Sequence, residues 1–357
     1  MKVGVKLSKN QIKSLQLLSF GHLVFSLTKQ CPLKCAHCIV SSEQDSQDTG
    51  TLSYEQAQFF AAQLAELGAH HVRRVSFTGG EPVLSFRQLN IMSQAAVQAG
   101  MTCTVVTSGY FADSIQNAYK YIMDFPFIQN WHFSTDSYHE CFVPRSNIIN
   151  AVTAARCLGK NVIIRMTVEK PISSKNHEIY SYLKSKMPDV DFFIQPVINS
   201  GRAESIDKSL EYSLEPAGPC VTGGMVVRYD GTVSPCCSGL IEKRQGHPFI
   251  FQNVFDIGIL SVYQSWLQHP VLKLIQAVGF APLLMLLREG FSGIKMETGV
   301  PQHPCECCLW LWSHQGVSDY ISSRLNSPQN REKINMVYEK LFGIRTIHEC
   351  QNGGRHE

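Results

Sequence analysis

Short apolar runs alternate with longer amphipathic runs through roughly the first 200 residues of the chain. The apolar runs are rich in β-branched and aromatic residues, and they predict strands at 22–28, 72–77, 102–107, 131–135, 161–168 and 191–197. Apolar positions at helical spacing predict helices at 53–68, 86–98, after residue 111, near 147–158 and near 177–186. Ser53 and Gln56 add a capping-box pattern to the first helix. This alternation predicts an α/β fold with a parallel sheet curled into a barrel or part of one.

Polar motifs follow four of the predicted strands at the point where each strand ends. They are CPLKCAHC at 31–38, TGGEP at 78–82, TSGY at 107–110 and STDSYH at 134–139. Parallel sheets of this kind carry their chemistry at the C-terminal ends of the strands. We therefore expect these four segments to meet in one functional site.

Composition and charge exclude several classes of protein. The net charge is +3 over 357 residues and the basic residues are scattered, which argues against nucleic acid or an anionic membrane as a partner. The first residues show no secretory signal pattern, and the longest apolar stretch, 271–287, contains Lys273 and a proline. We expect that stretch to form two buried or partner-facing helices rather than a membrane span, and the protein to be cytoplasmic.

Thirteen cysteines are an odd number in a long chain without an export signal, so a disulfide framework is not expected. Four are isolated and are interpreted as buried or incidental thiols: Cys103, Cys141, Cys157 and Cys350. The other nine are grouped, which in a reducing compartment indicates metal. The groups are Cys31, Cys35 and Cys38; Cys220; Cys236 and Cys237; and Cys305, Cys307 and Cys308.

The first group suggests an iron–sulfur cluster with one open iron. The thiolates of Cys31, Cys35 and Cys38 can hold three irons of a [4Fe–4S] cluster, whereas an electron-transfer cluster needs four ligands. Two alternatives remain at this point: a zinc site completed by His37 or a distant residue, and three unrelated buried cysteines.

The segment CPLKCAHC, with His37 before its last cysteine, resembles the signature of radical S-adenosylmethionine (SAM) enzymes. The resemblance covers about residues 23–203 and implies a full or partial (β/α)6 barrel. It also implies that SAM chelates the open iron and that one electron from the reduced cluster cleaves SAM to a 5′-deoxyadenosyl radical. His37 is carried over as a cofactor-binding residue.

The TGGEP segment resembles the GGEP segment of the same family. The resemblance implies that Gly79 and Gly80 let the backbone approach the methionine part of SAM, and that Glu81 holds its ammonium group. A plain strand-to-helix turn is the alternative interpretation.

Four further cofactor-binding residues are carried over from the family pattern. Ser108 would lie near SAM, and Ser134 and Asp136 would bind its ribose hydroxyls. Arg165 would pair with the SAM carboxylate, a geometry that suits the guanidinium fork. Each could instead be an ordinary surface or capping residue. His132 and His139 are candidates for a proton relay or for packing.

A second metal site is predicted from four later cysteines. An Asp-Gly turn predicts a hairpin at 225–234, which brings Cys220 and Cys236 to the same end, and Cys305 and Cys308 have two-residue spacing. The four thiols could hold zinc or a [4Fe–4S] cluster. The pattern resembles the one-cluster twitch form of the auxiliary domain of radical SAM enzymes rather than the two-cluster SPASM form.

Cys237 and Cys307 are left over beside these predicted ligands. They could replace their neighbours as ligands, be spare thiols, or form a separate site for a thiophilic species such as trivalent arsenic. Residues 242–290 carry no motif that assigns a role to them. We expect an N-terminal extension at 1–20, the barrel at 21–210, the auxiliary domain at 211–325 and a C-terminal helix and tail at 326–357.

The resemblance implies an enzyme that abstracts a hydrogen atom, with a flavodoxin or ferredoxin as its one-electron donor. Only 30 residues precede Cys31, too few for a peptide-recognition domain, so we expect a small-molecule substrate that is oxidised, dehydrogenated or epimerised. Modification of a ribosomal peptide is the second candidate. A thiol-rich protein that handles zinc or arsenic without radical chemistry is the third.

Overall fold

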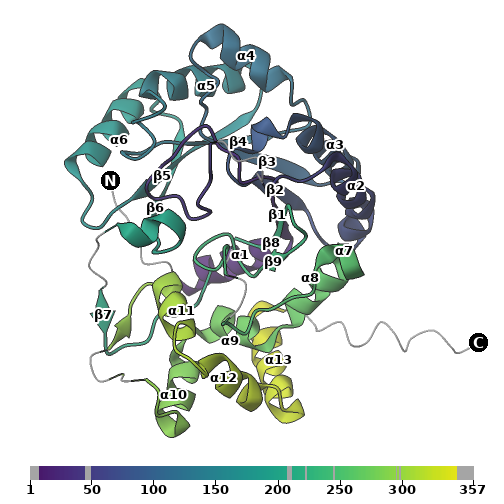
Figure 1. Ribbon diagram of the computed structural model, residues 1–357, viewed down its shortest axis with the longest axis vertical. Helices are drawn as coiled ribbons and strands as arrows, with labels where there is room; N and C mark the ends of the chain where they lie inside the picture. The colour runs from purple at the N-terminus through teal and green to yellow at the C-terminus, as the bar shows by residue number, and fades with distance from the viewer. Residues whose placement is uncertain are drawn as a thin grey trace, which may run out of the picture.

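The computed structural model describes residues 8–44, 50–206, 211–221, 223–243, 246–294, 296 and 299–343. Its centre is a curved sheet whose strand order is β6-β5-β4-β3-β2-β1-β8-β9, with helices along the outer side of the curve (Figure 1). Strands β1 to β6 are all parallel to their neighbours. The sheet is a partial barrel, since β6 and β9 form its two ends.

All six predicted strands are confirmed, with ends that differ by at most two residues. They are β1 His22–Ser26, β2 Arg74–Thr78, β3 Thr102–Thr107, β4 Asn130–Ser134, β5 Asn161–Val168 and β6 Asp191–Pro196. The predicted helices are also present: α2 Tyr54–Ala69, α3 Phe86–Gln98, α4 Ile115–Met123, α5 Arg145–Cys157 and α6 Ser174–Lys186. Ser53 and Gln56 form the predicted capping box at the start of α2.

The sheet continues beyond the sixth strand through a segment distant in sequence. Strand β8 (Met225–Arg228) pairs in parallel with β1, and β9 (Val233–Ser234) returns antiparallel to β8 as the predicted hairpin. The sheet thus crosses the boundary expected near residue 210. Because β1 precedes the first cysteine motif and β8–β9 lies between Cys220 and Cys236, this pairing brings two cysteine groups to one region.

Helices below the barrel complete the molecule (Figure 1). They are α7 Val254–Ile257, α8 Ile259–Gln268, α9 Pro270–Val278, α10 Ala281–Gly290, α11 Pro304–Trp312, α12 Val317–Leu325 and α13 Pro328–Phe342. Two 3-10 turns, η1 Pro82–Leu84 and η2 Gly201–Ser205, follow β2 and β6, and strands β7 Tyr212–Ser213 and β10 Val300–Pro301 form a small separate sheet. Helix α1 (Lys9–Phe20), which the sequence analysis treated as an extension, begins at a capping box formed by Ser8 and Gln11.

The apolar stretch 271–287 forms two helices, α9 and α10, as predicted, and half of their apolar side chains are buried. In the part of the chain that the structure describes, no single helix has the length and apolar composition to cross a membrane. Helices α9 and α10 reach this length and apolar composition only when they are taken together, and the two helices are bent by 116° relative to each other.

One continuous apolar core joins the barrel to the lower helices. It runs from barrel residues such as Phe25, Phe77 and Trp131 to residues of the lower helices such as Trp266 and Leu283. A core of this kind fixes the two halves of the molecule against each other, so that loops from both halves can form one site.

Candidate active site

The loop with the first three cysteines leaves the C-terminal end of β1 and lies against the loop after β2. The amide of Gly80 donates to the carbonyl of Thr28 at 2.5 Å, and the amide of Glu81 donates to that of Gln30 at 2.8 Å. A Cβ atom on Gly80 would lie 2.2 Å from the Gln30 oxygen, closer than any side chain tolerates. The glycine pair is therefore required where the two loops touch, a reason that differs from the expected approach to SAM.

A second contact holds the same loop from the side of β6. Arg202, in η2, donates from Nε to the carbonyl of Cys35 at 3.0 Å, and its Nη1 donates to that of Ser42. The amide of Arg202 donates to the carbonyl of Cys38 at 2.9 Å. Gly201 has φ +61° and packs on the carbonyl of Cys38. Sequence reasoning missed this clamp, because only the fold brings residues 201 and 202 to the cysteine loop.

Burial shapes the chemistry of the cysteine loop. Burial raises the pKa of the Cys31 thiol to about 12, with a further contribution from the Glu81 carboxylate. Burial and the Asp136 carboxylate likewise raise the pKa of Cys35 to about 12. Cys38 lies close enough to add to both shifts. Thiolates in such a place need a positively charged centre beside them.

Glu81 is buried with one carboxylate oxygen free for a ligand. Its Oε2 accepts hydrogen bonds from the amide and hydroxyl of Ser108, at 2.9 and 2.6 Å. Its Oε1 is buried and has no hydrogen-bond partner among the described residues. Burial raises the pKa of this carboxyl group, and the bonds from Ser108 oppose that shift. Ser108 therefore orients Glu81, and Oε1 can accept from an ammonium group.

Asp136, just beyond β4, links two histidines near Cys35. Its Oδ2 lies 3.1 Å from Nε2 of His37, and its Oδ1 lies 2.9 Å from Nδ1 of His139. Although burial opposes the shift, the two histidines hold the pKa of Asp136 well below its usual range. Burial also opposes charge on His139, but Asp136 raises its pKa.

Backbone amides complete the surroundings of this carboxylate. The amides of Tyr138, His139 and Thr167 donate to Asp136, so both of its oxygens already have partners. Binding of ribose by Asp136 stays a prediction that would require one of these contacts to open.

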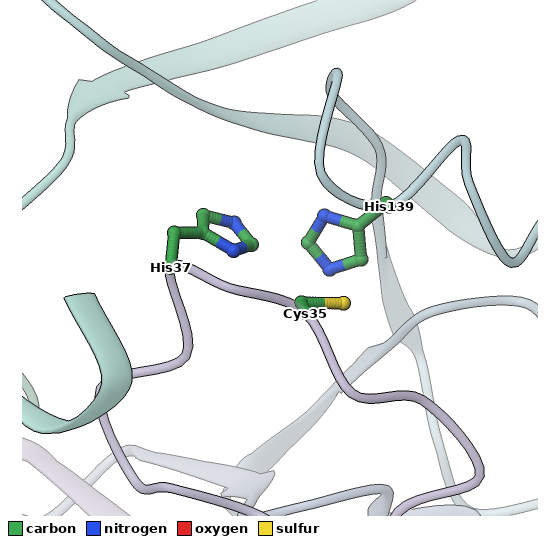
Figure 2. Close-up of side chains that lie close together, drawn as sticks. All are labelled: Cys35, His37 and His139. Carbon is green, nitrogen blue, oxygen red and sulfur yellow. The ribbon is translucent and has the colours of Figure 1, made fainter. Parts of the chain in front are cut away.

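Figure 2 shows the two imidazole rings facing Cys35. One ligand atom from each of Cys35, His37 and His139 lies within 4.8 Å of the others, and these three form the only such set of cysteine, histidine or acidic side chains among the described residues. Sequence reasoning had offered His37 for cofactor binding and His139 for a proton relay. It did not foresee that one carboxylate joins them.

Arg165, on β5, faces a thiol of the later cysteine groups. Its Nη2 donates to Gln195 at 3.3 Å and its guanidinium lies 5.2 Å from the Phe193 ring, while no carboxylate among the described residues forms an ion pair with it. Burial lowers its pKa, and the Cys237 thiol opposes that shift. Ser134 lies beside Arg165 in the register of β4 and β5. A guanidinium in this position can bind a carboxylate.

His132, the other proton-relay candidate, lies on β4. Burial, with Arg165 and His22, lowers its pKa to about 4. Its imidazole is therefore neutral at physiological pH, and a relay through it stays a prediction.

The structure brings together the four later thiols expected to form a metal site. Burial raises the pKa of each, and the four lie within electrostatic reach of one another: Cys220, Cys236, Cys305 and Cys308. Cys307 points elsewhere, into the core, where it contacts the backbone of Ala217. Cys237 lies beside the group on the side of Arg165. Cys350 lies outside the described residues.

The spacing of the thiols fits clusters better than single ions. Sulfurs that share one tetrahedral zinc lie about 3.8 Å apart, given a Zn–S bond of about 2.3 Å. Neither the three early thiols nor the four later ones form a set within 4.8 Å in the described part of the chain. In a four-iron cluster each thiolate binds a different iron, which requires wider spacing. The residues thus fit a [4Fe–4S] cluster and SAM: two buried thiols and one half-buried thiol, an orphaned carboxylate oxygen for an ammonium group, and a guanidinium for a carboxylate.

Comparison with known proteins agrees with this geometry. Residues 25–171 match the sequence profile of the Radical SAM superfamily. "Putative peptide biosynthesis protein YydG" of Bacillus subtilis (strain 168) is 27% identical over 277 residues, which cover 75% of this chain and 80% of that protein.

Solved structures show the same fold. "Native anSMEcpe with bound AdoMet" has a TM-score of 0.52 and 15% identity, and the match covers 85% of this chain and 98% of the other. "Native anSMEcpe with bound AdoMet and Kp18Cys peptide" has a TM-score of 0.51 and 15% identity, over 85% and 97% of the two chains. At these identities the likeness concerns the fold alone.

Proposed function

The chain belongs to the radical SAM superfamily, and we propose that it removes a hydrogen atom from an α-carbon of a peptide and returns one from Cys237, which inverts that centre. The substrate class rests on the peptide-biosynthesis relative, whose alignment spans most of both chains. This reverses the order expected from the sequence, in which a small molecule came first. The expectation rested on the short segment before Cys31, and a peptide can also bind through the barrel rim.

The enzyme uses SAM and a [4Fe–4S] cluster, which together supply, when bound, the one-electron chemistry that removes a hydrogen atom from an unactivated C–H bond. We assign Cys31, Cys35 and Cys38 to the cluster, Glu81 to the SAM ammonium and Arg165 to a carboxylate. The residues that hold loop 31–38 keep the reacting groups in place and exclude water.

The position of Cys237 is the observation that supports the proposed reaction. It packs with Cys38 and Ile39 against one small apolar cluster, and it also lies beside Arg165 and the four-thiol group. Burial raises its pKa, which keeps the sulfur protonated, and an S–H bond readily yields a hydrogen atom to a carbon radical. Inversion needs such a donor on the face opposite to abstraction, whereas oxidation needs none.

The return of hydrogen from Cys237 needs one external electron, in addition to the electron that cleaves SAM. The S–H bond of Cys237 breaks, a C–H bond forms on the opposite face of the α-carbon, and sulfur is left as a thiyl radical. One electron from a flavodoxin- or ferredoxin-type donor and one solvent proton restore the thiol. These donors and the iron chemistry belong to a reducing compartment, so we place the enzyme in the cytoplasm.

We also propose that Cys220, Cys236, Cys305 and Cys308 hold a second [4Fe–4S] cluster of the twitch type. The support is their mutual proximity and burial, with spacing too wide for one zinc ion. A fully ligated cluster beside Cys237 also lies where it can exchange electrons with the sulfur.

Solvent deuterium tests the reaction directly. Reduced enzyme, SAM and each member of a panel of synthetic peptides are incubated in D2O, and the products are analysed by mass spectrometry and chiral amino-acid analysis. Inversion through Cys237 adds one deuterium per modified residue and yields a D-residue. The Cys237→Ala variant should still form 5′-deoxyadenosine but incorporate no deuterium at the α-carbon.

Three outcomes contradict the proposal. A product that loses two hydrogens without solvent deuterium indicates net oxidation, with an electron leaving through the later thiol group. Unchanged deuterium incorporation by Cys237→Ala, alongside a Cys307→Ala control, removes Cys237 as donor. Turnover of an amino sugar in place of peptides would restore the small-molecule interpretation.

A further inference from the structure

We propose that Cys35, His37 and His139 bind a single soft divalent ion of the zinc type in the cluster-free protein. The ion and the first cluster would exclude each other, because both require the Cys35 thiolate. The exclusion rests on the proposed role of Cys35 as a cluster ligand, whereas the binding of the ion does not. The site would thus decide which metal the newly folded chain accepts.

The three donors converge from two loops. Cys35 and His37 come from the loop after β1, and His139 comes from the segment between β4 and α5 (Figure 2). Cys35 and His37 are buried and His139 is nearly so, and their ligand atoms already lie within 4.8 Å of one another. If the distances between these ligand atoms shortened by about 1 Å, they would match those of a tetrahedral zinc site.

Asp136 orients both imidazoles from behind. It contacts Nε2 of His37 and Nδ1 of His139, so the opposite nitrogen of each ring is left to face the third donor. A carboxylate that holds the far nitrogen of a ligating histidine is the common outer contact of zinc sites. Here one buried aspartate makes that contact to two histidines.

The free nitrogen of His37 supplies an independent sign of a ligand. His37 is 92% buried, and its Nδ1 has no hydrogen-bond partner among the described residues. A buried nitrogen without a partner destabilises the folded chain, and a bond to a metal ion would remove that cost. Tyr138 stacks on the ring at 4.6 Å and 17°, which limits rotation away from this position.

The donor set selects the ion. Two imidazoles and one thiolate suit Zn²⁺, or Cd²⁺ as its probe, and disfavour Mg²⁺ and Ca²⁺, which prefer oxygen. Three protein ligands leave a fourth position for water. Zinc bound in this way would keep Cys35 from iron until a cluster-assembly step removes it.

The test uses the full-length, cluster-free protein with ¹⁵N-labelled histidine, loaded with ¹¹³Cd²⁺ and observed by NMR. We expect one cadmium resonance that is coupled to imidazole ¹⁵N. His139→Ala should remove this resonance. His132→Ala, a change of another barrel histidine, should leave it.

Absence of any nitrogen-coupled resonance in the wild-type protein overturns the proposal, since cadmium would then bind thiolates alone. This result does not depend on a variant that folds, and it would leave the proposed peptide reaction intact.

A second measurement tests the exclusion. Pre-incubation with one equivalent of Zn²⁺ should lower the iron taken up during reconstitution by about four per chain, and His139→Ala should restore it. Equal iron uptake with and without zinc would show that the two metals do not compete for Cys35.

Discussion

Gly80 shows how a single residue fixes the active-site loop. Its amide donates to Thr28 and the space next to its Cα is filled by the Gln30 carbonyl, so the position excludes any side chain. The next residue, Glu81, then points its free oxygen into the site. The contact that requires glycine is therefore also the one that places the carboxylate.

Replacement of Gly80 by alanine should disrupt the first metal site. The new Cβ would force the loop after β1 away from the loop after β2, so we expect loss of about four irons per chain and of SAM cleavage. Iron analysis and 5′-deoxyadenosine formation measure both effects. Gly218→Ala is the matched control, because a Cβ there meets no atom within 4 Å. Full iron in Gly80→Ala would contradict this account.

Lys273 is a buried charge far from the active site. Its Nζ donates to Oδ1 of Asn335 at 2.7 Å and lies 5.4 Å from the Tyr338 ring, so it ties α9 to α13. Burial lowers its pKa from 10.5 to about 8, against the opposing effect of Glu339. Between these values the unfolded chain binds a proton that the folded chain has released.

Stability should consequently rise with pH between about 8 and 10.5 through this residue. Relative to Lys273→Met, the wild-type free energy of unfolding should gain up to ~1.4 kcal/mol per pH unit over that range. Denaturant unfolding of both proteins at several pH values measures the difference. Parallel pH profiles would show that Lys273 keeps its ordinary pKa.

At the scale of elements, local sequence patterns predicted most helices and strands of the barrel. Contacts between segments that are far apart in sequence could not be predicted in this way. The strands of the barrel followed from short apolar runs, and α2 followed from its capping box, because periodicity and capping are local properties. Helix α1 carries the same kind of signal at Ser8 and Gln11, and attention to it would have found the helix.

The candidate site likewise has parts that the sequence predicted and parts that it did not. Its cysteine and glycine motifs could be recognised because each is contiguous in sequence. The clamp by Arg202, the link through Asp136 and the meeting of Arg165 with Cys237 join segments that are far apart in sequence. Only the order of strands in the sheet determines such contacts, and no local pattern encodes it.

The Arg202 clamp gives a prediction at this scale. Arg202→Ala removes two side-chain hydrogen bonds to the carbonyls of Cys35 and Ser42, and leaves those oxygens without these donors. We expect faster loss of iron from the first site on exposure to a chelator, with the barrel still folded. Iron release and circular dichroism measure the two effects. Arg202→Lys should restore little of the iron retention, since one ammonium group cannot reach both carbonyl oxygens.

At the scale of the whole molecule, the pairing of β8 with β1 unites two thiol groups from distant parts of the chain. One group lies on a loop held by η2 and the turn after β2, and the other lies between the β8–β9 hairpin and α11. One core runs beneath both. Because each group has its own supporting elements, loss of one metal site should leave the other formed.

Two cysteine variants test this independence. With both clusters the chain should hold about eight irons, and Cys35→Ala and Cys308→Ala should each hold about four. Cys35→Ala should lose SAM cleavage altogether, because the remaining cluster is fully ligated. Cys308→Ala should retain part of it, because loop 31–38 is held by contacts that do not involve α11. SAM cleavage by Cys35→Ala at the wild-type rate would show that the open iron lies elsewhere, and about eight irons in Cys308→Ala would show that its sulfur is not a ligand.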